Sequence, residues 1–333
     1  MLRRVRSRLV VSVLAMMGAL APRLPEPLLS AAIEAAAGAM YRAQPARRAL
    51  VRANLERVCR FLKADGRASS DVAIAAADPE ALDRLVRRAF AQYVRYYVEV
   101  LVAPSYGPQQ IAQLVRVETP DAVAELLSPA AREQGTILVA LHLGAIELPG
   151  RYLAEVAGRP VTAPMETLAD PILQRFIVRR RGRTGVRIVP LRDARRALLD
   201  VLDRGEIAGL IADRALGVGG YEANLFGARA VLPAGPALLA TERDVPVWVA
   251  AVHRLGSRDR SSRARYGVRL LRLETPAAGT RRERISAFLA VQARLFEDLI
   301  AVAPEQWWTI FFPIWPDLQP GSAPAEVAAG AAT

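Results

Sequence analysis

The stretch that decides the fold is Gly135-Thr-Ile-Leu-Val-Ala-Leu-His142-Leu-Gly-Ala-Ile-Glu147-Leu-Pro-Gly150. Residues 137–141 are apolar without interruption and partly β-branched, which is typical of a buried parallel strand. His142 stands at the carboxyl end of this predicted strand, where ligands gather in α/β proteins. Residues 148–157 are predicted to be helical, with Glu147 at the helix start. We therefore expect the chain to fold the Glu147 carboxylate back toward the His142 imidazole.

His142 and Glu147 would then form a general base and the group that orients it. An imidazole held in one tautomer by a carboxylate can take a proton from a hydroxyl near neutral pH, which raises a rate by about 10²–10⁴. A structural interpretation competes with this one. A core histidine next to a glutamate at a helix start would have the same spacing, so the pair alone does not establish a catalytic site.

Strands and helices alternate after His142, which is the pattern of an α/β layer. A second buried strand, residues 206–212, ends at Asp213-Arg214. Two neighbouring parallel strands would deliver His142 and Asp213 to one edge of the sheet, as an active site requires. The glycines at 217–220 are only a weak phosphate-binding signal, because the full glycine fingerprint is absent. The predicted fold is an α/β protein with a mostly parallel central sheet flanked by helices.

Arginines end the helix that is predicted to begin after Asp170. Its apolar residues Ile172, Leu173, Phe176 and Ile177 form an expected core stripe, which continues at helical spacing into Arg180 and Arg181, with Arg183 nearby. A guanidinium at the inward end of such a stripe can bind a phosphate or a carboxylate in a bidentate manner. The alternative is a solvated arginine cluster, favoured by the helix macrodipole.

The order of these features resembles the glycerolipid (lysophospholipid) acyltransferase superfamily. Within it, the chain looks like the bacterial lipid A biosynthesis (lauroyl/myristoyl) acyltransferases and the related phosphatidylinositol mannoside acyltransferases. The resemblance covers residues 45–317 and includes Phe226-Gly, Pro233-Ala-Gly-Pro236 and Pro304-Glu-Gln-Trp-Trp308. The last of these motifs looks more like the mannoside branch. Ala145 and Ile146 depart from the pattern, because family members usually have asparagine and tryptophan there.

This resemblance implies an acyltransferase that moves a fatty acyl chain from acyl-CoA or an acyl carrier protein to a hydroxyl of a membrane glycolipid or phospholipid. The acceptor would be a mannosylated phosphatidylinositol or a lipid A-type molecule, and no cofactor is implied. His142 would act as the base and Glu147 would orient it. Arg181 and Arg183 would bind phosphate, while Asp213 and Arg214 would shape the acceptor pocket. The two departures suggest an alternative, a catalytically silent lipid-binding protein on the same fold.

Composition narrows the class of partner. The 333 residues carry a net charge of +12, and 44 of the 45 basic residues are arginine, because Lys63 is the only lysine. No nucleic-acid-binding motif accompanies this charge, so an anionic membrane surface with phosphate-bearing substrates is the better expectation than nucleic acid. One cysteine, Cys59, excludes an internal disulfide, and two histidines, His142 and His253, make a zinc site improbable.

The N-terminus begins with four arginines before the apolar run 9–21. Thirteen residues are too few for a comfortable membrane span, which needs about 20. A signal peptide is one interpretation, but the apolar continuation to residue 39 favours an interfacial anchor on the cytoplasmic face of the plasma (inner) membrane, peripheral or monotopic. The expected organisation is membrane-associating helices at 1–40, an acyltransferase domain at 41–317 and a disordered tail at 318–333. The sequence gives no indication of the oligomeric state.

Overall fold

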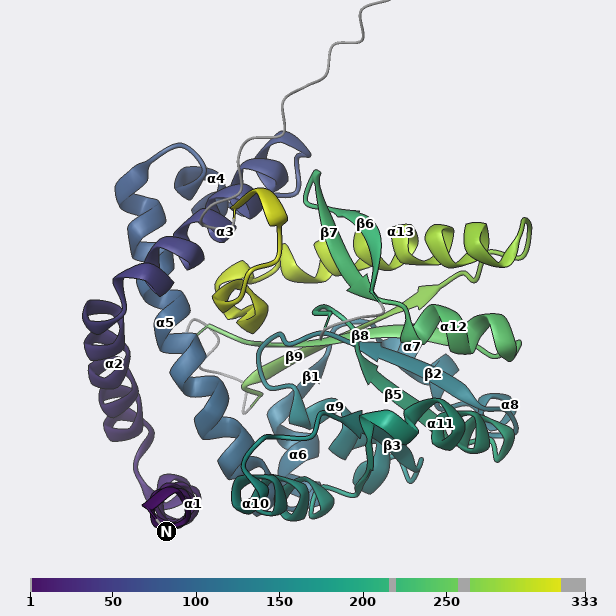
Figure 1. Cartoon of the computed structure of the whole chain (residues 1–333), viewed down its shortest axis with the longest axis horizontal. Coiled ribbons are helices and arrows are strands. Elements are labelled where there is room, and N and C mark those ends of the chain that lie inside the picture. The colour runs from purple at the N-terminus through teal and green to yellow at the C-terminus, as the bar shows by residue number, and fades with distance from the viewer. Residues whose placement is uncertain (1, 216–219, 257–263, 319–333) are drawn as a thin grey trace, which may run out of the picture.

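The computed structural model describes residues 2–215, 220–256 and 264–318 of the chain, so residues 319–333 of the predicted tail and the glycines at 217 and 219 lie outside the described residues (Figure 1). Leu318, the first residue of the predicted tail, ends a short 3-10 turn that begins at Pro316. Within that part, seven strands form one sheet in the order β1-β9-β8-β2-β5-β3-β4. Neighbouring strands pair in parallel except β8 and β9, which are antiparallel. The mostly parallel α/β sheet is therefore as predicted. The strands are β1 (Val115–Val117), β2 (Thr136–Ala140), β3 (Val161–Met165), β4 (Val186–Pro190), β5 (Ile207–Ile211), β8 (Val247–Arg254) and β9 (Tyr266–Leu273).

Strand β2 lies at the centre of the sheet and is buried on both faces. Ile137 and Val139 pack into the larger core beneath α13 (Arg281–Ile300), whereas Leu138 packs into a second cluster with Leu153 and Trp248. Successive side chains of a strand point to opposite faces, which explains why the run had to be apolar at every position. β5 runs parallel to β2, with Ala140 opposite Ile211. The residues that follow both strands therefore reach the same edge.

Helices cover both faces and one end of this sheet (Figure 1). A separate antiparallel hairpin, β6 (Gly220–Leu225) and β7 (Ala228–Pro233), packs against α13. The remaining helices of the α/β layer are α6 (Pro108–Leu114), α7 (Pro120–Leu126), α8 (Pro129–Arg132), α9 (Glu147–Arg151), α10 (Pro171–Gly182), α11 (Ala194–Asp203) and α12 (Gly235–Glu242).

Helix α10 differs from the prediction, because none of its residues is buried. The expected core stripe from Ile172 to Ile177 is only half-buried. The reason is that α10 lies at the periphery, over the edge strand β4 and against α1, where neither neighbour covers it completely. The core interpretation of this helix was therefore wrong.

The N-terminal part is helical, as predicted for 1–40, and continues into three further helices that line one end of the sheet (Figure 1). These elements are α1 (Leu2–Leu20), α2 (Glu26–Ala43), α3 (Pro45–Ala64), α4 (Ser70–Ala75) and α5 (Pro79–Val102). Among the described helices, none combines the length and the apolar character that crossing a bilayer would require.

The C-terminal segment after α13, yellow in Figure 1, lies between helices α3 and α5 and the edge of the sheet. Trp307 and Trp315 are completely buried there, and Asn54 of α3 donates to the carbonyls of Ile310 and Phe312 at 2.8 and 3.0 Å. These contacts join residues more than 250 positions apart. They fix the segment over the sheet edge at which His142 and Asp213 stand.

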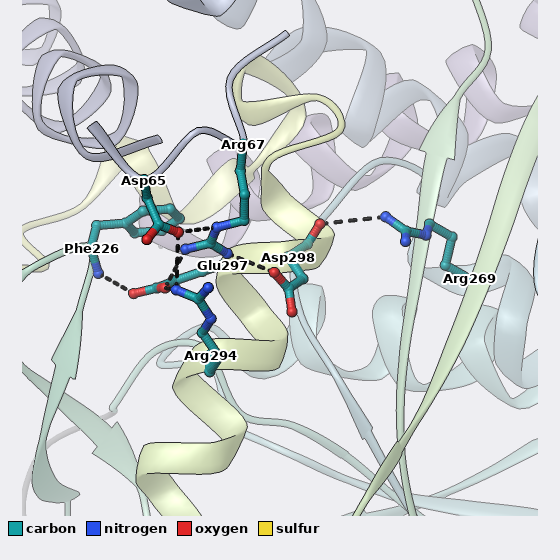
Figure 2. Close-up of polar contacts among 7 residues, drawn as sticks. All are labelled: Asp65, Arg67, Phe226, Arg269, Arg294, Glu297 and Asp298. Carbon is teal, nitrogen blue, oxygen red and sulfur yellow. Dashed lines mark hydrogen bonds and ion pairs between the residues drawn. The ribbon is translucent and has the colours of Figure 1, made fainter. Parts of the chain in front are cut away.

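A polar cluster centred on Glu297 secures the hairpin β6-β7 to the helices (Figure 2). Glu297 accepts the backbone N–H of Phe226 at 2.6 Å and a guanidinium N–H of Arg67 at 2.9 Å. Arg67 also donates to Asp298 at 2.6 Å and contacts Asp65. Phe226 has a φ of 50°, an uncommon conformation for a residue with a side chain. The cluster therefore holds a strained turn in place from two separate elements, α13 and the segment that follows α3.

Candidate active site

His142 and Asp213 meet at the carboxyl edge of the sheet, as expected. Nδ1 of His142 lies 2.7 Å from Oδ1 of Asp213, and the backbone N–H of His142 donates to Oδ2 at 3.0 Å. The carboxylate is buried, while the side chain of His142 is 19% exposed. Because an ionised carboxylate only accepts hydrogen bonds, Nδ1 carries the proton and Nε2 keeps its lone pair. The pair can therefore act as a base toward a group arriving from solvent or membrane.

The C-terminal segment saturates the second oxygen of Asp213. Trp307 Nε1 and Thr309 Oγ1 donate to Oδ2 at 2.8 and 2.6 Å. Burial alone opposes ionisation of Asp213, but His142, Thr309 and Trp307 outweigh it and hold the pKa of Asp213 below its ordinary value. With Oδ2 engaged by three donors, Oδ1 is the oxygen that faces the imidazole.

The expected contact between Glu147 and His142 needs correction. Nδ1 of His142 is bonded to Asp213, and the Glu147 carboxylate instead accepts from Nε of Arg181 at 3.0 Å. Glu147 begins α9, and its side chain reaches Arg181 of α10 rather than the imidazole. The negative charge of Glu147, opposed by desolvation, raises the pKa of Arg181. Arg181 is thus neutralised by a protein carboxylate, and Arg183 lies exposed just after α10.

Gly144 allows the turn that presents His142. Its φ is +55°, and a Cβ at this position would lie 2.2 Å from the carbonyl oxygen of Val252. The backbone N–H of Gly144 donates to Gln306 O at 3.2 Å, and that of Trp308 donates to His142 O at 2.8 Å. The loop after β2 is therefore held by the same C-terminal segment that holds Asp213.

The sequence analysis used the tryptophans of this segment only as part of a family motif and did not identify Thr309. The segment packs over the end of the sheet, and two of its side chains also bind the carboxylate that faces the histidine. The only available signal was the Pro304-Glu-Gln-Trp-Trp308 motif, since a threonine two residues after a tryptophan has no recognisable chemical pattern of its own.

Two apolar cavities border Glu147 of the Glu147–Arg181 pair, and one of them also borders Arg181. One is lined by Ile146, Ala163, Ile188 and Leu210 together with both members of the pair. The other lies between α5 and the loop after β2 and is lined by Tyr96, Ala145, Ile146 and Tyr266 beside Glu147. Ile146 lines both cavities, so one of the two departures from the family pattern stands in the wall that separates them.

Comparisons with known proteins identify the family of the chain. A phosphatidylinositol mannoside acyltransferase of Mycolicibacterium smegmatis is 28% identical over 276 residues, which cover 81% of each chain. Phosphatidylinositol mannoside acyltransferases from two strains of Mycobacterium tuberculosis are 30% identical over 165 residues, covering 48% of this chain and 51% of theirs. The sequence model of the family described as bacterial lipid A biosynthesis acyltransferase matches residues 2–315. The chain therefore belongs to this family of acyltransferases, as its motifs predicted.

Proposed function

We propose that the chain transfers a fatty acyl group from an acyl thioester to a hydroxyl of a membrane glycolipid, with His142 as the base and Asp213 as its orienting partner. The observation that carries this proposal is the 2.7 Å contact between Nδ1 of His142 and the buried, hydrogen-bonded Asp213. Such a pair needs neither a nucleophilic side chain nor a metal ion to activate a hydroxyl.

The reaction proceeds by direct transfer. Nε2 of His142 takes the proton of the acceptor hydroxyl while its oxygen attacks the thioester carbonyl, and the imidazolium is stabilised by Asp213. The tetrahedral intermediate then collapses, the carbon–sulfur bond breaks, and the imidazolium returns the proton to the departing thiolate. The products are an ester of the acceptor and a free thiol.

Glu147 and Arg181 act as positioning residues in this proposal. Their contact joins the start of α9 to the end of α10, on either side of an apolar cavity suited to an acyl chain. The donor is acyl-CoA or an acyl carrier protein. The acceptor we favour is a mannosylated phosphatidylinositol, because the relatives described above are acyltransferases named for that lipid.

The acceptor is a membrane lipid, so the protein must reach a bilayer. Helix α1 carries an exposed apolar stripe at helical spacing that includes Leu9, Val13, Met16 and Leu20. Exposed arginines, Arg8 and Arg23, flank this stripe on either side, where they can contact lipid phosphates. We therefore propose peripheral or monotopic attachment through the N-terminal helices to the cytoplasmic face of the plasma membrane, an anionic surface.

Thiol release tests the function directly. The purified chain is mixed with palmitoyl-CoA and vesicles containing a phosphatidylinositol mannoside, free thiol is recorded, and the lipid product is identified by mass spectrometry. We expect His142→Ala and Asp213→Asn to lower the rate by about 10²–10⁴. The matched control is His253→Gln, because this second histidine faces Glu118 at 3.5 Å rather than Asp213.

Two results would count against the proposal. Wild-type protein that binds the vesicles without releasing thiol above background would favour the silent lipid-binding alternative, which the substitutions at Ala145 and Ile146 suggest. An undiminished rate in His142→Ala would exclude the assigned base even if the protein is active.

A further inference from the structure

Arg214 occupies a position beside the catalytic pair that the mechanism does not use. It follows Asp213 directly, at the carboxyl edge of the sheet. Its guanidinium carbon lies 4.3 Å from the ring centroid of Phe312 and 5.4 Å from that of Trp308. The Trp308 ring in turn lies 4.8 Å from the imidazole of His142. One aromatic ring therefore separates this cation from the base.

Unlike Arg181 and Arg254, Arg214 has no anionic partner among the described residues. Across the described part of the chain, no carboxylate forms a salt bridge or hydrogen bond with it, and its Nε atom is buried without an acceptor. By contrast, Arg181 is paired with Glu147 at 3.0 Å, and Arg254 donates to Glu99 at 2.7 Å. A guanidinium held on ring faces has lost part of its hydration. An arriving anion therefore forms a stronger ion pair with it than with a fully solvated arginine.

The aromatic residues around Arg214 form a partly open shelf. Tyr97 of α5 is 43% exposed, and its ring lies 6.5 Å from Trp308. Trp308 and Phe312 are themselves only half-buried. Ring faces next to a cation suit a ligand that combines an anionic group with a ring or an apolar chain. A phosphate ester has both parts, whereas a free phosphate ion has only the charge.

We propose that Arg214, held against Phe312 and Trp308, binds a phosphate ester of a substrate and so positions that substrate beside His142. This inference rests on the proposed acyl transfer and adds the recognition of one of its reactants. The planar fork of arginine matches two phosphate oxygens, and Arg181, the arginine first expected to do this, is already occupied by Glu147. The phosphate belongs either to the headgroup of the acceptor or to the nucleotide part of the donor.

The test compares Arg214→Gln and Arg214→Lys with the wild type in the full-length chain, using paired substrates that differ in phosphate. The acceptors are a phosphatidylinositol mannoside and a mannosyl diacylglycerol, which lacks phosphate. The donors are palmitoyl-CoA and palmitoyl-pantetheine, which also lacks phosphate. The matched control is Arg272→Gln, because Arg272 also lies over a ring, that of Trp248 at 5.1 Å, but is paired with Glu125 at 3.1 Å.

We expect Arg214→Gln to raise KM about tenfold or more for one phosphate-bearing substrate and to leave its phosphate-free counterpart unchanged, with a smaller rise in Arg214→Lys. A rise confined to the phosphatidylinositol mannoside identifies the headgroup, and one confined to palmitoyl-CoA identifies the donor. Unchanged KM values for all four substrates, or equal increases with and without phosphate, would overturn the proposal.

A binding measurement separates this inference from the catalytic one. Inorganic pyrophosphate should raise the Tm of the wild type and of Arg272→Gln but not that of Arg214→Gln. This result does not require turnover, so it can hold even if no acyl transfer is found. Equal stabilisation of the wild type and Arg214→Gln by pyrophosphate would refute the anion site while leaving the roles of His142 and Asp213 intact.

Discussion

Replacing Thr309 by valine tests whether the support of Asp213 matters for catalysis. The valine keeps the shape of threonine but removes the hydroxyl that donates to Asp213 Oδ2 at 2.6 Å, leaving the Trp307 and His142 donors at 2.8 and 3.0 Å. A hydrogen bond to a charged group contributes about 1.5–3 kcal/mol, which would correspond to about a 10- to 150-fold loss of rate if it acted wholly in the transition state. Because two donors remain, we expect kcat to fall about tenfold.

The same variant should change the pH dependence of stability. The pKa of Asp213 is lowered in the folded protein, so its ionised form contributes stability above the unfolded pKa, and this contribution is lost as the pH falls through the folded pKa. Removing a donor raises the folded pKa of Asp213. The stabilising contribution is then smaller, and it disappears at a higher pH than in the wild type.

The assay combines thiol release at saturating substrate with urea unfolding across the acidic range. Thr309→Ser should restore both properties, because it returns the hydroxyl. Trp315→Phe is the control, since Trp315 lies in the same segment but donates to the carbonyl of Leu225 at 3.0 Å, so it should lose stability and keep kcat. The reasoning is refuted if Thr309→Val retains kcat within about twofold, the range that a loss of less than about 0.5 kcal/mol allows.

Three further predictions follow from contacts outside the catalytic pair. Glu147→Gln and Arg181→Met should each lower activity, because each leaves the charge of the other residue unpaired. The double variant removes both charges, so its loss of activity should be smaller than the two single losses combined. A double-mutant cycle on kcat/KM measures this difference, and strict additivity would argue against the pairing. Glu297→Gln should reduce the free energy of unfolding by about 3 kcal/mol, since it removes a buried charge that faces Arg67. Urea titration measures this loss, and an unchanged urea midpoint would show that the cluster does not stabilise the fold. Leu9→Asp with Met16→Asp should reduce co-sedimentation with anionic vesicles while leaving thiol release with a detergent-solubilised acceptor unchanged. Equal sedimentation of the variant and the wild type would place the membrane contact elsewhere.

Local pattern identified much of the catalytic half. The apolar runs predicted the buried strands β2 and β5, and their lengths placed His142 and Asp213 at a common edge. The error at α10 has a related origin. An apolar stripe indicates which face of a helix avoids water, but it does not reveal whether the surface that receives this face is a complete core or a peripheral edge strand.

The sequence by itself determined the α/β class, the family and the histidine at a strand end, because strand burial and motif spacing are properties of short stretches of chain. Only the tertiary structure decided which carboxylate meets that histidine. Glu147 is five residues away along the chain but is turned toward Arg181, whereas Asp213 arrives on the neighbouring strand and is fixed by Trp307 and Thr309 from the far end of the sequence. The physical reason is that hydrogen bonds of the site depend on which strands become neighbours and on how a distant segment packs over their ends, and spacing in the sequence contains no information on either.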